Sequence, residues 1–126
     1  MNPDYHLGLL CLTHLLVGAD GVIAESESNA LQLIKVNERV PENVFAEFEL
    51  LVKNRKERDI FQMVIDLMNR CSNEEKIKVF VMLYKLSEVD GRVHVKEIKL
   101  LLYSIKLAGV EFEDLVLKAM ATPPLL

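Results

Sequence analysis

The chain has 126 residues, 51% hydrophobic and 27% charged, which is the composition of a globular protein. Such a chain fits one domain, which we expect to span residues 1–126. A formal net charge of −4 repels phosphate backbones, so nucleic acid is not an expected partner. The apolar run near the N-terminus is broken by Thr13 and His14 and is too short to span a bilayer. We therefore expect a cytoplasmic protein with no membrane partner.

Apolar residues recur at helical spacing along the chain, and glycine and proline mark the boundaries between runs. Asp20-Gly21 ends the first run, because glycine accepts the left-handed backbone found at many helix ends. Pro41 suits the first turn of a later helix. Ser72 and Glu75 have the spacing of a capping box. The predicted helices cover residues 4–18, 25–38, 41–53, 58–71, 73–88, 95–107 and 111–121.

The two halves of the chain resemble each other at an offset of 70 residues, which aligns Asp20 with Asp90 and Glu27 with Glu97. No segment shows sustained alternation of period two, so we expect no sheet. Two copies are too few for a solenoid. The sequence therefore predicts an all-α fold of about seven helices in a single bundle, with two pseudo-twofold-related halves.

The repeat is clearest in ADGVIAESE, residues 19–27, and VDGRVHVKE, residues 89–97. In both, an aliphatic residue follows the glycine by two places and a glutamate follows the aspartate by seven. This spacing overlays the last eight positions of an EF-hand calcium loop. Leu16 or Leu86 would then occupy the first ligand position, where leucine offers no side-chain oxygen. The comparison argues against an EF-hand.

A second interpretation concerns the start of the following helix. Each glutamate falls at the third helical position, where a capping box places its acid. The capping residue itself would be Ala24 in the first copy and His94 in the second, and neither is a favoured cap. The helix dipole still favours an acid there by about 0.3–1 kcal/mol. The remaining alternative is that Glu27 and Glu97 pair with Asp20 and Asp90 across the turns to hold a cation.

The chain resembles the TerB-like family of helical domains associated with tellurite resistance, and also the related N-terminal domain of DjlA-type co-chaperones. The segments that carry the resemblance are LLVGADGVIAESESNAL, LYKLSEVDGRVHVKEIKLLL, NEEKIKVFVMLYKL and IKLAGVEFEDL. The resemblance implies an all-α domain whose acidic motifs bind a divalent cation such as calcium, magnesium or manganese. Carried onto this sequence, the ligands are Asp20, Glu27, Asp90 and Glu97.

The second motif departs from the family pattern, because Arg92, His94 and Lys96 stand between its glycine and its glutamate. Positive neighbours repel a cation, so we expect the second site to be the weaker one.

Three other features favour ordinary structural roles. Cys11 and Cys71 lie in apolar helical patterns, which predicts buried free thiols in a reducing compartment. Cys11 and His14 share a helix face, but a zinc site needs three or four such ligands. The segment KNRKERD, residues 53–59, mixes both charges and has no aromatic residue for base stacking, which is typical of a solvated connector.

No serine has a G-x-S-x-G setting, and the sequence contains neither a phosphate-binding glycine loop nor an HExxH motif. We therefore expect a non-enzymatic domain of the stress-response type that binds a divalent cation or a protein partner through its acidic turns. The partner is unidentified, and a second copy of the chain is one candidate. The alternative is a structural docking module that has no metal site.

Overall fold

The computed structural model describes residues 3–17, 25–90, 93–105 and 111–125. These residues form seven helices and no strand, which confirms the all-α prediction. None of these helices has both the length and the apolar character needed to cross a membrane. The helices are α1 (Pro3–Val17), α2 (Glu25–Asn37), α3 (Glu42–Asn54), α4 (Glu57–Arg70), α5 (Asn73–Val89), α6 (Val95–Ser104) and α7 (Phe112–Met120).

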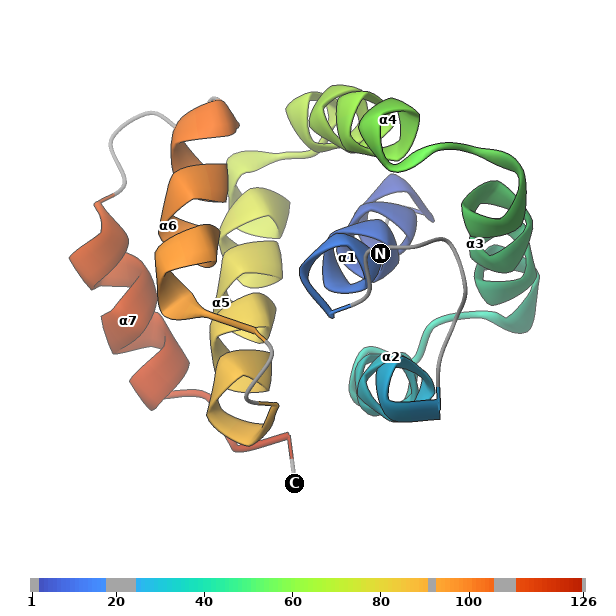
Figure 1. Ribbon diagram of the computed structural model, residues 1–126. Helices are drawn as coiled ribbons and strands as arrows, with labels where there is room; N and C mark the ends of the chain where they lie inside the picture. The colour runs from blue at the N-terminus through green and yellow to red at the C-terminus, as the bar shows by residue number, and fades with distance from the viewer. Residues whose placement is uncertain (1–2, 18–24, 91–92, 106–110, 126) are drawn as a thin grey trace.

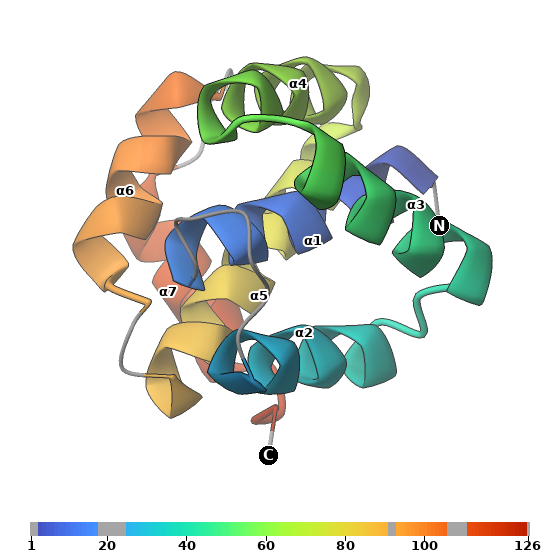
Figure 2. The ribbon, with the colours of Figure 1, turned by 45° about the vertical axis from the view of Figure 1, so that its right-hand side comes forward.

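Helix α1 forms the centre of the molecule, packed against α2, α3, α4 and α5 (Figures 1 and 2). All ten residues from Tyr5 to His14 are buried. A helix that is apolar on all sides must be surrounded by other elements, and α1 has that character. Gly8 lets α4 approach closely, because a Cβ at this position would collide with the terminal methyl group of Met68.

The predicted repeat is visible in the order and contacts of the helices. Helices α1, α2 and α3 begin at Pro3, Glu25 and Glu42, and α5, α6 and α7 each begin 70 residues later. Helix α1 packs on α2 and α3, as α5 packs on α6 and α7. Helix α4 stands between the two sets and has no counterpart. The chain therefore repeats a three-helix unit around one inserted helix (Figure 1).

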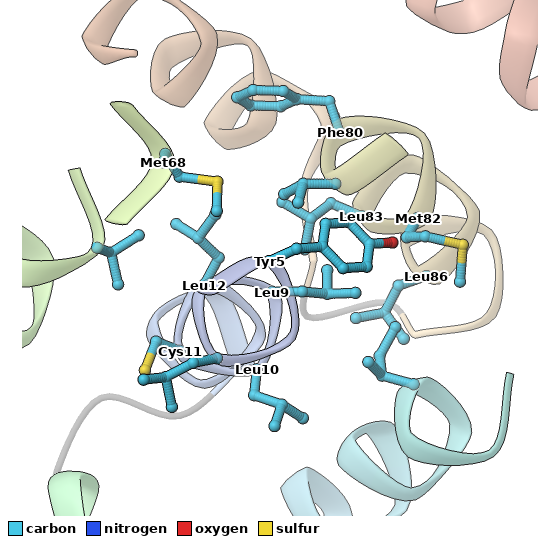
Figure 3. Packing of buried hydrophobic residues seen from close by; sticks show 14 of the residues in the cluster. Tyr5, Leu9, Leu10, Cys11, Leu12, Met68, Phe80, Met82, Leu83 and Leu86 are labelled. Atoms are coloured by element: carbon cyan, nitrogen blue, oxygen red, sulfur yellow. The ribbon is translucent and has the colours of Figure 1, made fainter. Parts of the chain in front are cut away.

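Contacts between α1 and its neighbours make one continuous core. Leu12 of α1 points toward Met68 of α4, whereas Leu9 lies toward Leu83 and Leu86 of α5 (Figure 3). All five side chains are essentially inaccessible to solvent. Burying an aliphatic side chain of this size contributes about 1.5–3 kcal/mol. The two repeat units are thus joined by apolar packing between α1 and α5.

The end of α6 differs from the sequence prediction. The predicted helix over residues 95–107 stops at Ser104, because Ile105 has an extended backbone with φ −109° and ψ 128°. Ile105 is buried, and its backbone N–H still donates to the Leu101 carbonyl at 3.2 Å. The chain therefore leaves the helix while its next apolar side chain stays in the core.

The predicted capping box at the start of α5 is confirmed. The Glu75 N–H donates to Ser72 Oγ at 3.2 Å, and the Ser72 N–H donates to Glu75 Oε1 at 3.1 Å. We expect Ser72→Ala to lower the free energy of unfolding, measured by urea denaturation, by about 1 kcal/mol, since it leaves a helix N–H without its acceptor. Ser104→Ala is the control and should change it by less than about 0.5 kcal/mol. Equal effects of the two substitutions would contradict this assignment.

Candidate functional site

The structure places three of the four predicted acidic ligands. Glu27 lies in the first turn of α2, Asp90 caps the C-terminus of α5, and Glu97 lies in the first turn of α6. Asp20 lies outside the described residues. The pairing of Asp20 with Glu27 therefore stays a prediction, whereas Glu27 has defined contacts with other described residues.

Glu27 is a buried acid that is bound to a histidine. Only 1% of its surface is exposed, and its Oε2 lies 2.8 Å from Nδ1 of His14, which is equally buried. A carboxylate can only accept hydrogen bonds, so the imidazole N–H donates. His14 belongs to the last turn of α1 and Glu27 to the first turn of α2. This hydrogen bond therefore links the C-terminal end of α1 to the N-terminal end of α2, on either side of the first Asp-Gly motif.

The second carboxylate oxygen of Glu27 is left open. Its Oε1 is buried and has no hydrogen-bond partner within the described parts of the chain. A buried polar atom without a partner costs about 1–3 kcal/mol, and a charged one costs more. The arrangement thus presents a buried acceptor that a cation or a donor would satisfy.

Apolar and aromatic groups line the pair on the side of α3. Phe48 meets the His14 ring edge-on, with centroids 6.3 Å apart and planes at 73°. Phe48 is itself fully buried and contacts Phe45, with centroids 5.8 Å apart. Hydrogen bonds become stronger in such a low-dielectric environment. The packing therefore fixes the imidazole in the orientation that serves Glu27.

Sequence reasoning missed this role of His14, which it considered as a soft-metal ligand beside Cys11 and as an ordinary buried residue. The signal was available in the predicted elements. The connection between the first two helices is short, so the last turn of one must approach the first turn of the next. A histidine and an acid in those two turns are then natural partners.

The second motif is built differently. Glu97 is exposed, and the position 70 residues after His14 is Tyr84, which packs edge-on against Phe112 with centroids 6.4 Å apart. His94 is the N-cap of α6 and makes no capping hydrogen bond with its side chain. The repeat has therefore kept the acid at the helix start but not the buried partner. Among the described residues, no three His, Cys, Asp or Glu side chains gather in a way that could hold a metal ion.

Glu97 instead faces an open groove of about 680 Å³. Its lining residues come from the last turn of α1, the first two turns of α4 and one face of α6. Its apolar surface includes Leu15, Leu16 and Leu101. Glu57 and Arg58 of α4 line the groove together with Glu97. Glu97 of the second motif thus lies at the surface beside the groove, whereas Glu27 of the first motif is buried.

Both cysteines are buried and free, as the sequence predicted. Burial raises the pKa of the Cys11 thiol to about 12, and burial together with the nearby Glu75 carboxylate raises that of Cys71 to about 11. Metal binding requires the thiolate, so these shifts disfavour zinc at Cys11 and His14.

We expect neither native thiol to react with iodoacetamide at about pH 8, because the attacking species is the thiolate. Both should react after unfolding in guanidinium chloride, counted by mass spectrometry. Fast alkylation of either native thiol would contradict their burial.

The raised pKa of Cys11 also predicts that the folded state loses stability as pH rises from 9.0 to about 12. In that range the thiol of the unfolded chain ionises and the native thiol does not.

Comparison with known families agrees with this architecture. A family model described as "Tellurite resistance protein TerB" matches residues 6–118. The match runs from the first turn of α1 into α7 and includes both Asp-Gly motifs. No curated protein and no solved structure matches the chain.

Proposed function

The chain belongs to the TerB family, and from that premise we propose that it is a non-enzymatic, cytoplasmic module that binds a divalent cation through Asp20 and Glu27. The observation that carries the proposal is the open Oε1 of Glu27, which is buried and lacks a partner among the described residues. Calcium, magnesium and manganese prefer carboxylate oxygens, so such an atom is a suitable ligand for them.

His14 supports this role by orienting the carboxylate. Its ring N–H donates to Oε2 at 2.8 Å, and Oε1 is the oxygen without a hydrogen-bond partner among the described residues. Glu27 therefore offers one oxygen rather than two, unlike the last glutamate of an EF-hand. Donors that hold the far side of a ligand in this way commonly position metal-binding carboxylates. The rest of the oxygen shell would come from Asp20, backbone carbonyls and water.

Asp90 and Glu97 form the weaker counterpart in this proposal. Glu97 is exposed, and His94 and Lys96 lie beside it in the sequence. Solvent competes for an exposed carboxylate, and a neighbouring cationic side chain repels a metal ion. We extend the tellurite-resistance and stress-response association of the family to this chain as part of the same proposal.

Isothermal titration calorimetry with calcium, magnesium and manganese chlorides tests the proposal. Wild type should bind at least one of these ions saturably. Asp20→Asn and Glu27→Gln should each weaken that binding at least about tenfold, which is about 1.4 kcal/mol. Glu49→Gln, an exposed acid on α3, is the control and should bind as wild type does.

Two outcomes would overturn the cation site. One is the absence of saturable binding of all three ions by wild type. The other is binding that survives both substitutions unchanged in variants whose circular dichroism spectra match wild type. The second outcome would transfer the function to another surface of the domain.

A further inference from the structure

We propose that the groove between α1, α4 and α6 binds an amphipathic helix of a partner protein that carries basic residues beside its apolar face. The groove is open and has a volume of about 680 Å³, and its apolar surface comes from all three helices. This proposal does not depend on the cation site at Glu27, which is not among the described residues that line the groove, although Glu97 of the second motif does line it.

The apolar part of the groove includes large side chains that solvent reaches. Leu100 of α6 is 59% exposed and Phe61 of α4 is 38% exposed. On α6, the groove is lined at Glu97, Leu100 and Ser104, which lie on one face over two turns. Two helical turns span about 11 Å. That length matches the i, i+3, i+4 and i+7 anchors with which an amphipathic helix enters a hydrophobic groove.

The charged residues that line the groove favour a partner helix with basic rather than acidic residues. Glu57 and Glu97 are exposed, and neither forms an ion pair with any part of the chain that the structure describes. Arg58 is the cationic group that also lines the groove. Among the described residues that line the groove, two carboxylates against one guanidinium favour lysine or arginine on the incoming helix. The net charge of −4 would also attract such a helix from a distance.

A second copy of the chain fits this groove less well. A symmetric dimer through this groove would place the same two carboxylates, and two chains of the same net negative charge, opposite each other. Like charges across an interface disfavour association. A basic helix from another protein avoids this repulsion between carboxylates and still covers Leu100 and Phe61.

Fluorescence anisotropy with two labelled synthetic peptides tests the proposal. Both peptides are helices of about five turns with the same leucine face, one flanked by lysines and the other by glutamates. In EDTA, the full chain should bind the leucine–lysine peptide saturably and the leucine–glutamate peptide at least about tenfold more weakly. EDTA and the Glu27→Gln variant separate this test from the cation site, because neither should change peptide binding.

Matched variants locate the binding surface. Leu100→Ala and Glu97→Lys should each weaken binding of the leucine–lysine peptide about tenfold or more. Leu50→Ala on α3 replaces a leucine of similar exposure, 61%, and Glu113→Lys reverses an acid in the first turn of α7, so both should bind as wild type does.

Three results would overturn the proposal. The first is unchanged affinity in both groove variants, and the second is equal or tighter binding of the glutamate peptide. The third is concentration-dependent dimerisation of wild type in sedimentation that Leu100→Ala abolishes, which would assign the groove to a second copy.

Discussion

Replacing His14 with leucine is expected to lower the free energy of unfolding by about 3–5 kcal/mol, because it leaves a buried carboxylate without its donor. In the native structure Glu27 Oε2 has His14 Nδ1 as its partner at 2.8 Å, and Oε1 has no partner in the part of the chain that the structure describes. Removing the imidazole would leave both oxygens of this nearly inaccessible acid without a donor from the described residues. Urea denaturation at neutral pH measures the loss.

The double variant His14→Leu with Glu27→Leu separates the cost of a broken pair from the cost of lost packing. An apolar pair of similar volume has no buried charge to satisfy, so it should recover most of the lost stability. A loss below about 1 kcal/mol in His14→Leu would contradict the buried pair. A double variant no more stable than His14→Leu would do so as well.

Phe48→Ala is expected to have an equally large effect, about 3–5 kcal/mol, through a cavity next to the same pair. Phe48 is fully buried on α3 and meets both the His14 ring and Phe45. Phe48→Leu keeps most of the volume and should cost less than about 1.5 kcal/mol. Urea denaturation of both variants gives the comparison.

Phe61→Ala on α4 is the control for the loss of an aromatic ring. Phe61 is 38% exposed at the groove, so its truncation leaves no closed cavity. It should therefore cost much less than Phe48→Ala. Similar losses at the two positions would show that burial does not determine the stability of this region.

The helices could be predicted from the sequence because their apolar residues follow the helical period and because glycine, proline and caps mark their ends. The end of α6 was wrong for a physical reason. Ile105 fits the helical pattern, but it is buried in the core from an extended backbone. The spacing of apolar residues predicts that Ile105 is buried. It does not predict which backbone conformation places Ile105 in the core.

The candidate site was harder to predict, since the two motifs look equivalent in sequence. Glu27 and Glu97 hold the same position in their helices, but one is buried and the other is exposed. The difference lies in what faces each acid. His14 faces Glu27, whereas its counterpart Tyr84 packs on Phe112. Such pairings depend on how helices cross, which local sequence does not specify.

The repeated turn has therefore diverged into two surfaces with separate proposed roles. The first copy encloses an acid with one open oxygen beside His14, for which we propose a cation. The second copy displays its acid at a groove, for which we propose a basic helix in addition to the weaker cation site of Asp90 and Glu97. Both copies have a glutamate at the third helical position. Whether that glutamate is buried or exposed determines which ligand we propose for it.

A crystal structure of the chain grown with calcium or manganese chloride tests the central claim most directly. The account predicts an ion about 2.0–2.6 Å from Oε1 of Glu27, with Asp20 among its ligands and His14 still bound to Oε2. A structure in which Oε1 accepts a hydrogen bond from the protein, with no ion beside Glu27 at millimolar metal, would contradict it.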